Sequence, residues 1–292
     1  MGPLFPQLSS FPDSPHTCSF GHSHSTQFAV DFGAKNITTV GSRICVASTC
    51  ITCLLMSGQV YFYYGLSNFF QNHRRYVISK DDYQLHGSVE TPKPSCEPYR
   101  FDPNGKVYAP CGAIAMSLFN DSFTLKYLGK SSEPLAKPLQ VPMTNKGIAW
   151  RTDVEEKFGK PPADSWANTV KPVSWKKSAL ERSSGAYSED EELLVWMRVS
   201  ALPTFRKLHR LVTHVGAFSN GLPAGIYSVD IEYSYPVTQF GGTKRIILST
   251  MSWLGGRNPT LGISYIVVGS VGLILGLIFF ILHFHTMKQS EL

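Results

Sequence analysis

Cysteine carries the most direct chemistry in this chain, because thiols can form disulfides, bind zinc or exchange electrons. The six cysteines are Cys18, Cys45, Cys50, Cys53, Cys96 and Cys111. An even number is compatible with disulfides, but spacing alone does not settle how they pair. Cys96 and Cys111 stand apart from the others and flank the turn-forming stretch Pro-Asn-Gly at 103–105. A bridge between them would close a loop of about 15 residues, worth roughly 3 kcal/mol in the chain-entropy model, and we predict it.

Cys50 and Cys53 form a C-x-x-C motif, a spacing found in zinc sites and in redox-active disulfides. The sequence has no second half at the spacing of a zinc ribbon and no βαβ pattern around the motif. We therefore favour structural disulfides among Cys45, Cys50 and Cys53 over a metal site, and we expect no cofactor. The histidines between 16 and 24 lie in a Ser/Pro/His-rich segment, which is more typical of a solvated tail than of a metal site.

Two asparagines begin glycosylation sequons. Asn36 and Asn120 each start an N-x-[ST] triplet without proline in the middle, whereas Pro259 excludes the triplet at Asn258. Such triplets also arise by chance, but glycans and disulfides both belong to the secretory pathway and the cell exterior. The sequence therefore predicts a luminal or extracellular domain.

The strongest local signal is the stretch from Leu261 to Phe284, which contains no charged residue other than His283 near its end. It exceeds the roughly 20 residues that a helix needs to cross the hydrocarbon core of a bilayer, so we predict a transmembrane helix. Gly272 and Gly276 form a G-x-x-x-G pair within it, which would let a partner helix approach closely. The alternative is that glycine is simply common in membrane helices.

The charges around this helix conflict with the orientation that the cysteines and sequons predict. Lys244, Arg245 and Arg257 precede the helix and only Lys288 follows it. The positive-inside rule by itself would therefore place the large N-terminal portion in the cytosol. We give more weight to the disulfide and glycosylation chemistry.

Composition and motifs exclude several classes of function. Only 16% of the residues are charged, against about 25% in average soluble proteins. The net charge of +6 comes from scattered residues, with no basic stripe interleaved with aromatics, so nucleic acid is not an expected partner. The sequence also lacks a Walker A motif, a G-x-S-x-G elbow, an H-E-x-x-H motif and an aspartyl-phosphate loop, so we do not expect an enzyme.

Three segments are predicted to be strands. Val60 to Tyr64 is rich in β-branched and aromatic residues, and Tyr227 to Tyr235 alternates apolar with polar residues. Arg245 to Trp253 follows after Gly241-Gly242, so we expect these last two strands to form a hairpin that leads into the membrane helix. The pattern predicts a mainly β fold, an antiparallel β-sandwich ectodomain with helical insertions, plus the C-terminal transmembrane helix.

Two helices are predicted in the insertions. Ser188 and Glu191 fit a capping box for a helix that reaches Met197 and ends before Pro203. A second amphipathic helix is expected from Thr204. Its apolar face would contain Phe205, Leu208, Leu211 and Val212, and its solvated face Arg206, Lys207 and Arg210.

These signals divide the chain into four parts. Residues 1–40 are expected to be an atypical disordered segment, because they are rich in Pro and Ser and lack the n-region and h-region of a signal peptide. Residues 41–258 form the ectodomain, 261–284 the transmembrane helix and 285–292 a short cytosolic tail. The apolar stretch 44–56 is interpreted as buried ectodomain, with a second membrane span as the alternative.

Six stretches of the sequence, between about 60 and 290, together resemble one family. They are YYGLSNFFQNHRRYVISKDD at 63–82, CEPYR at 96–100, APCGAIAMSLFNDSF at 109–123, KGIAW at 146–150, VWMRVSALPTFRKLHRL at 195–211, and GGTKRIILSTMSWLGGRNPTLGISY at 241–265. The family is the cell cycle control protein 50 / Lem3 (transmembrane protein 30) family. The resemblance implies a non-catalytic accessory (beta) subunit of a type-four P-type ATPase that flips phospholipids. Such a subunit supports the folding of its catalytic alpha subunit, exit from the endoplasmic reticulum and aminophospholipid translocation.

The resemblance also implies roles for particular residues. The family's ectodomain is glycosylated and disulfide-bonded, so Cys96 with Cys111 and the sequon at Asn120 carry over. Arg257 and Asn258 sit where the family's ectodomain meets the membrane, and with the Gly272/Gly276 face they are candidates for partner contact. The family's location is the membranes of the endoplasmic reticulum, Golgi and cell surface. Family members have two membrane spans and usually four cysteines ahead of the first aromatic strand, and this sequence departs from both features.

Two other interpretations remain open. A β-sandwich on a membrane anchor is equally suited to a stand-alone adhesion or glycan-binding protein. The departures near the N-terminus are also compatible with a truncated, non-functional member of the family.

Overall fold

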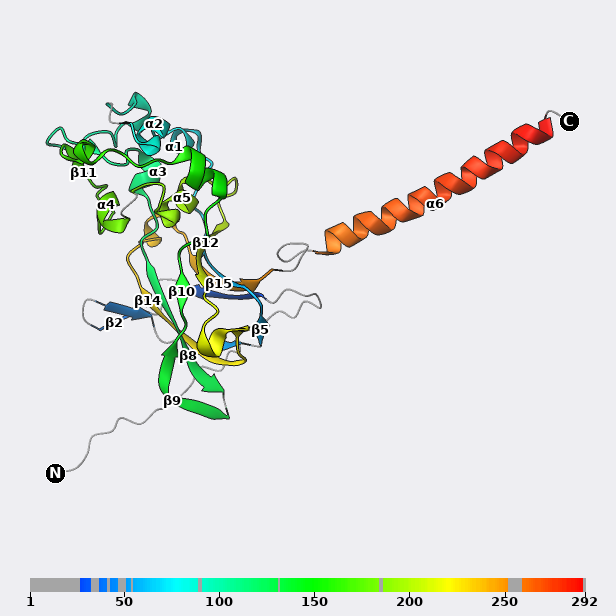
Figure 1. Ribbon diagram of the computed structural model, residues 1–292, viewed down its shortest axis with the longest axis horizontal. Coiled ribbons are helices and arrows are strands. Elements are labelled where there is room, and N and C mark those ends of the chain that lie inside the picture. The colour runs from blue at the N-terminus through cyan, green and yellow to red at the C-terminus, as the bar shows by residue number, and fades with distance from the viewer. Residues whose placement is uncertain are drawn as a thin grey trace.

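The computed structural model describes residues 27–32, 37–40, 43–46, 51–53, 55–88, 91–130, 132–183, 186–251 and 259–290. Two antiparallel sheets pack face to face, short helices gather at one end of them, and the long C-terminal helix α6 (Pro259–Ser290) stands clear of the sheets (Figure 1). The predicted mainly β fold with helical insertions and a C-terminal apolar helix is confirmed. Residues 262–283 of α6 are long and apolar enough to cross a membrane.

The first sheet, sheet A, has five strands among the described residues, in the order β1-β15-β6-β12-β10, and every neighbouring pair is antiparallel. Its strands are β1 (Gln27–Phe32), β6 (Val60–Leu66), β10 (Met143–Thr144), β12 (Phe205–Val212) and β15 (Lys244–Thr250). The predicted strand at 60–64 is confirmed and extends through β6.

The second sheet, sheet B, follows the order β2-β3-β14-β8-β9, with β4 also pairing with β14. Its strands are β2 (Ile37–Val40), β3 (Arg43–Val46), β4 (Ile51–Cys53), β8 (Ser122–Lys130), β9 (Glu133–Gln140) and β14 (Gly225–Glu232). Among the described strands β9 is the outermost on its side, and all its residues are exposed. Two smaller pairs join β5 (Met56–Ser57) with β13 (Gly221–Leu222), and β7 (Val107–Tyr108) with β11 (Thr169–Val170).

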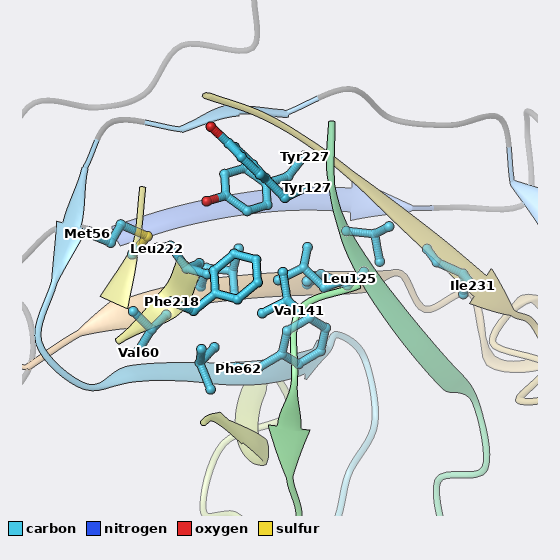
Figure 2. Close-up of a cluster of buried hydrophobic side chains, with 14 residues drawn as sticks. Met56, Val60, Phe62, Leu125, Tyr127, Val141, Phe218, Leu222, Tyr227 and Ile231 are labelled. Atoms are coloured by element: carbon cyan, nitrogen blue, oxygen red, sulfur yellow. The ribbon is translucent and has the colours of Figure 1, made fainter. Parts of the chain in front are cut away.

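The main core lies between the two sheets (Figure 2). Successive side chains of a strand point to opposite faces, so alternate positions of each sheet meet in the middle. The core residues of these strands include Val60, Phe62, Ile246 and Leu248 from sheet A and Leu125, Tyr127, Tyr227 and Val229 from sheet B. The predicted period-two pattern of β14 therefore reflects this buried face.

Part of the N-terminal segment is ordered in strands. Residues 27–32 and 37–40, which the Pro- and Ser-rich composition had assigned to a disordered segment, form β1 and β2. β1 pairs along its whole length with β15, from Gln27 opposite Ser249 to Phe32 opposite Lys244. The disorder prediction is wrong for these residues, because long-range pairing with β15 orders a segment whose local composition is biased. The rest of 1–40 lies outside the described residues.

The expected hairpin between the last two strands does not form. β14 pairs with β8, β3 and β4, whereas β15 pairs with β1 and β6 in the other sheet. The connection from Glu232 to Lys244 is longer than a hairpin loop of two to five residues, and Tyr235 and Val237 within it are buried. It crosses from one sheet to the other, so the hairpin prediction is wrong.

The segment from Thr204 is strand β12 rather than the predicted helix. β12 pairs with β6 from Phe205 opposite Leu66 to Leu211 opposite Tyr61. Its inward positions include Lys207 and His209, so polar residue types concealed the period-two pattern of a strand. His209 packs against the rings of Phe62 and Phe123, and burial, helped by Arg210, lowers its pKa well below the usual value.

The helical insertions form a cap at the end of the sandwich where β6 ends and β12 begins (Figure 1). Its helices are α1 (Arg74–Val77), α2 (Asp82–His86), α3 (Ala113–Met116), α4 (Ala179–Arg182) and α5 (Glu191–Met197). The short turns are η2 (Pro94–Cys96), η3 (Asp153–Lys157) and η4 (Ala163–Trp166), with η5 (Gly216–Phe218) and η6 (Thr238–Phe240) later in the chain.

Helix α5 confirms the predicted helix but not its capping box. Asp190 is the N-cap, and its carboxylate accepts a hydrogen bond from the Leu193 N–H at 3.2 Å. Glu191 is the first helical residue, so its carboxylate does not reach back to Ser188 and is available for another contact.

Candidate functional site

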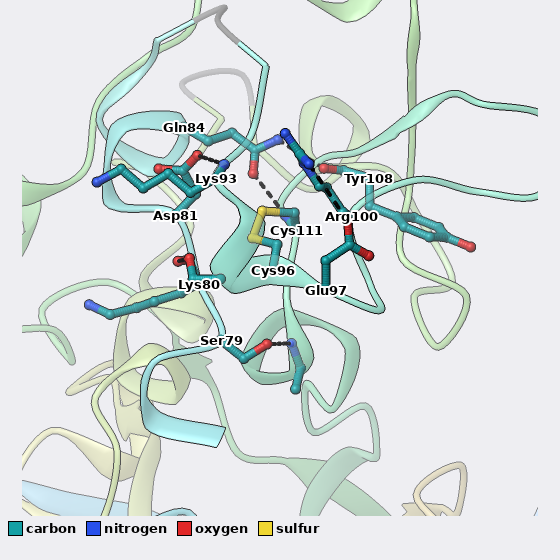
Figure 3. The surroundings of a disulfide bond; sticks show 12 residues. Ser79, Lys80, Asp81, Gln84, Lys93, Cys96, Glu97, Arg100, Tyr108 and Cys111 are labelled. Carbon is teal, nitrogen blue, oxygen red and sulfur yellow. Dashed lines mark hydrogen bonds and ion pairs between the residues drawn. A yellow bond between two sulfur atoms is a disulfide. The ribbon is translucent and has the colours of Figure 1, made fainter. Parts of the chain in front are cut away.

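Cys96 and Cys111 are joined by a disulfide within the cap, with their Cα atoms 5.7 Å apart (Figure 3). Cys96 ends η2 and Cys111 lies just before α3, and both residues are buried. The bridge therefore closes the loop 96–111 against the interior of the cap.

Gln84 of α2 holds this loop from the other side. Its Nε2 donates to the Tyr108 carbonyl at 2.8 Å, and its Oε1 accepts from the Cys111 N–H at 2.8 Å. Gly112 packs so closely on the backbone of Ser79 that an added Cβ would lie 2.2 Å from the Ser79 carbonyl oxygen. Only glycine fits at this contact, and its φ of +97° also favours glycine.

The turn inside the loop is organised by Asp102, a residue that the sequence analysis did not single out. Its carboxylate accepts hydrogen bonds from the Asn104 N–H at 3.0 Å and the Lys106 N–H at 2.7 Å. Gly105 adopts a φ of +79° at the same turn. The available signal was Asp-Pro-Asn-Gly at 102–105, in which Asp initiates a turn by bonding to backbone ahead of it.

The sequon at Asn120 lies at the start of β8, where the cap meets the sheets. Asn120 Nδ2 donates to the Ser174 carbonyl at 3.1 Å. The Ser122 hydroxyl donates to Glu232 at 2.7 Å on the surface. A glycan would replace one of the two hydrogens on Asn120 Nδ2 and leave the other to donate to Ser174.

The middle residue of that sequon forms a buried ion pair with Lys244 of β15. The side chains of Asp121 and Lys244 are both 0% exposed, and the Lys244 ammonium donates to the carboxylate and to the Tyr235 carbonyl at 2.8 Å. The other carboxylate oxygen of Asp121 accepts from the N–H groups of Ser234 and Tyr235, each at 2.6 Å. Burial lowers the pKa of Lys244 to about 8, and the negative charge and hydrogen bond of Asp121 oppose this fall.

This arrangement changes the role of Lys244. By its position in the sequence, Lys244 is one of the positive charges that flank the membrane helix, and the positive-inside rule applies to solvated side chains. In the structure the buried Lys244 side chain instead links sheet A to the start of β8 and to the connection between β14 and β15. Lys244 therefore carries no information about membrane orientation.

The carboxylate of Glu191 binds the backbone of the KGIAW stretch. It accepts hydrogen bonds from the N–H groups of Gly147, Ile148 and Ala149 at 3.0, 2.8 and 3.0 Å. Three consecutive N–H groups that converge on one carboxylate fix the path of this loop against α5. Glu191 was predicted as a capping residue, and its contacts lie instead with a segment more than 40 residues away.

Replacing Glu191 with Gln is expected to lower the free energy of unfolding by about 2 kcal/mol, because a hydrogen bond to a charged acceptor contributes roughly 1.5–3 kcal/mol and glutamine has one acceptor oxygen fewer. Urea denaturation of the full chain in detergent, followed by tryptophan fluorescence, measures the change. Glu155→Gln is the matched control, because Glu155 forms an exposed ion pair with Arg151. Equal effects of the two variants would contradict the role of Glu191.

Lys207 of β12 caps the other end of α5. Its ammonium donates to the carbonyls of Val195 at 2.9 Å, Trp196 at 3.2 Å and Arg198. A lysine at this position satisfies carbonyls that have no partner within the helix. Burial lowers its pKa to about 7. The prediction that Lys207 lies on a solvated face is therefore wrong.

A cavity of about 680 Å³ lies between α2, η3 and the end of α5. Its charged residues pair with one another: Asp153 is buried and binds both Arg198 and Lys157, and Lys80 binds Asp82. Burial opposes ionisation of Asp153, but the hydrogen bonds and charges of Arg198 and Lys157 outweigh it and lower its pKa. Among the described residues, no group of three His, Cys, Asp or Glu could hold a metal ion.

The remaining predicted sites are placed only in part. The backbones of Cys45 and Cys53 lie in β3 and β4, which both pair with β14. Asn36, Cys50, Arg257 and Asn258 lie outside the described residues. Gly272 and Gly276 lie on α6, and an added Cβ at either position would meet no atom of the described residues within 4 Å.

Four of the motif stretches meet at one point beneath the cap. The ring of Tyr64 stacks on Phe119 with centroids 3.9 Å apart and lies 6.5 Å from the ring of Trp196. Trp196 Nε1 donates to the Ile114 carbonyl at 2.8 Å. Lys244 lies 6.0 Å from the centroid of Phe119. The stretches 63–82, 109–123, 195–211 and 241–265 thus share one packed junction of aromatic rings and a buried ion pair.

The sequence of this chain matches a known protein family. The model of the LEM3 (ligand-effect modulator 3) family / CDC50 family matches residues 18–289. Cell cycle control protein 50A of Mus musculus is 47% identical over 246 residues, which cover 80% of this chain and 66% of that protein. Cell cycle control protein 50B of Homo sapiens is 43% identical over 249 residues, covering 81% of this chain and 70% of that protein.

A plant relative is also similar. ALA-interacting subunit 3 of Arabidopsis thaliana is 39% identical over 252 residues, covering 83% of this chain and 64% of that protein. The chain therefore spans about two thirds of the length of the curated relatives that it matches.

Proposed function

The chain belongs to the LEM3/CDC50 family, and from this premise we propose that it is the accessory subunit of a type-four P-type ATPase that moves phospholipids across a membrane. The name of the plant relative, an ALA-interacting subunit, supports a subunit role over an enzymatic one. The apolar helix α6 supports a membrane protein. In this proposal the ATPase supplies the catalysis and this chain supplies folding support, exit from the endoplasmic reticulum and aminophospholipid translocation.

The observation that carries the proposal is the junction of Tyr64, Phe119 and Trp196 with the Asp121–Lys244 pair. The stretches that resemble the accessory subunits are spread over the chain, yet four of them form this one packed unit. Their residues hold the cap on the sandwich. The motifs therefore describe a shared ectodomain scaffold, as expected of a subunit that presents a rigid surface to a partner.

The finer features belong to the same proposal. The ectodomain, residues 41–258, lies in the lumen or outside the cell, stabilised by Cys96–Cys111 and glycosylated at Asn120 and Asn36. Arg257, Asn258, Gly272 and Gly276 contact the ATPase alpha subunit near the membrane. The complex moves from the endoplasmic reticulum through the Golgi to the cell surface.

The test is to express the full chain with and without a flippase alpha subunit and to follow its gel mobility after glycosidase treatment. We expect Asn120→Gln to remove one glycan and shift the band. Asn36→Gln provides the second site. For the glycan readout alone, Asn258→Gln is the matched control, because Pro259 blocks that triplet. We expect resistance to endoglycosidase H to appear only when the alpha subunit is present.

Three outcomes would count against the proposal. If none of the variants loses a glycan, the ectodomain lies in the cytosol. Resistance to endoglycosidase H without any alpha subunit would favour the stand-alone adhesion or glycan-binding protein. A glycosylated chain that never leaves the endoplasmic reticulum with any alpha subunit would favour a non-functional family member.

A further inference from the structure

One end of sheet A is the end from which the chain leaves for α6. β15, β6 and β12 lie side by side, with Val60 opposite Thr250 and Tyr61 opposite Leu211. The start of β6, the end of β15 and the end of β12 therefore lie together. We refer to this end of the sandwich as the exit end.

Three large apolar side chains are exposed just beyond these strand ends. Leu55 directly precedes β5, the short strand just before β6, while Val215 follows β12 and Met251 follows β15. Their exposed fractions are 62%, 60% and 46%. The layer beneath them is packed core, because Met56, Val60, Phe218 and Leu222 are buried (Figure 2). The exposed residues thus project from a rigid base, although they come from three distant parts of the sequence.

The three segments that carry these side chains also lack charge. The segments 51–60, 211–225 and 246–251 contain no Asp, Glu, Lys or Arg, and His214 is their one titratable side chain apart from tyrosine and cysteine. The opposite ends of the same strands carry Arg206, Lys207, Lys244 and Arg245. Exposed apolar groups on uncharged segments mark a surface that another phase or molecule covers.

The covalent connection to α6 limits what can face this surface. Eight residue steps separate Met251 from Pro259, the first residue of α6, and a fully extended chain covers at most about 3.6 Å per residue. The exit end therefore lies within about 29 Å of the start of the membrane helix. The intervening sequence includes Trp253 and Leu254, residue types that favour the membrane interface or its interior, and Arg257, a residue type that can extend its charge to the interface.

We propose that Leu55, Val215 and Met251 form a lipid-docking surface that rests in the interfacial layer of the bilayer in which α6 is anchored. Apolar side chains gain free energy by leaving water for this layer, and the three segments carry no charge that would have to be dehydrated in the process. The tether keeps this end near lipid. The proposal needs only that α6 crosses a membrane, so it holds or fails independently of the flippase partner.

The test uses the full chain in phosphatidylcholine nanodiscs with a spin label on a keto amino acid introduced at position 55, 215 or 251, one at a time. Collision with a water-soluble nickel relaxant is compared with collision with oxygen, which concentrates in lipid. Position 202 is the matched control, because Leu202 is 68% exposed and lies beside the opposite end of β12. Labelled chains are taken as correctly folded when their disulfide content and circular dichroism spectrum match those of the unlabelled chain.

We expect labels at 55, 215 and 251 to lose most of their collisions with nickel relative to position 202 and to gain collisions with oxygen. Equal nickel access at all four positions would overturn the proposal. Protection that appears only after a flippase alpha subunit is added would also overturn it, because the surface would then be covered by protein.

Discussion

Replacing Asp121 with asparagine is expected to lower the free energy of unfolding by about 3–5 kcal/mol, the range found when one partner of a buried ion pair is removed. The substitution is almost isosteric, and the amide oxygen can still accept from the Ser234 and Tyr235 N–H groups. What it removes is the negative charge beside a Lys244 side chain that is 0% exposed. The ammonium is then left buried beside the Tyr235 carbonyl without its counter-ion.

This experiment has two internal controls. Asp230→Asn breaks the Lys126–Asp230 pair, whose side chains are 38% and 47% exposed, and is expected to change the free energy by no more than about 1 kcal/mol. The double variant Asp121→Leu with Lys244→Met removes both charges and is expected to recover much of the loss. Urea denaturation of the full chain in detergent measures all three. Equal losses for Asp121→Asn and Asp230→Asn would contradict a buried pair.

The substitution also separates folding from glycosylation. Asp121→Asn leaves the sequon at Asn120 intact, since any residue except proline is allowed in its middle position. We therefore expect this variant to keep its glycan while losing stability. A lost glycan would mean that the variant disturbs the chain before the acceptor site is modified.

Replacing both Cys96 and Cys111 with serine is expected to lower the free energy of unfolding by about 3 kcal/mol, because the bridge closes a loop of 15 residues in the unfolded chain. The folded loop keeps its hydrogen bonds to Gln84 and its turn at Asp102, so we expect the variant to fold. Urea denaturation in detergent measures the difference.

Reduction of the wild-type chain provides the control. Dithiothreitol should lower the urea midpoint of the wild type toward that of the double serine variant. The variant itself should then respond only through any disulfides among the other cysteines. An unchanged midpoint in the variant before reduction would show that the bridge does not stabilise the native state.

The fold could be predicted where a strand buries one apolar face. β6 and β14 were recognisable because Val60, Phe62, Tyr227 and Val229 recur at every second position. β12 was missed because its inward positions include Lys207 and His209, so no apolar alternation marked the buried face. The pairing of β14 and β15 with different sheets also depends on long-range contacts that no short window contains.

The candidate site was predictable to the same limited degree. Cys96 and Cys111 could be paired because they stand apart from the other cysteines in the sequence. The ion pair of Asp121 and Lys244 joins residues 123 positions apart, and only the folded chain shows that both are buried. Glu191 was recognised as a special position near a helix start, but its true partners, the N–H groups at 147–149, have no side-chain signature.

Strand β9 has a consequence for how copies of this protein behave when they are crowded in one membrane. It forms an outer edge of sheet B, where unpaired N–H and C=O groups could recruit a strand from a neighbouring molecule. Pro134 and Pro138 have no N–H group to donate. Lys137 between them adds a positive charge, which the same lysine of a second copy would repel. These residues therefore oppose strand pairing between neighbouring chains at this edge, and the sandwich resists edge-to-edge aggregation there.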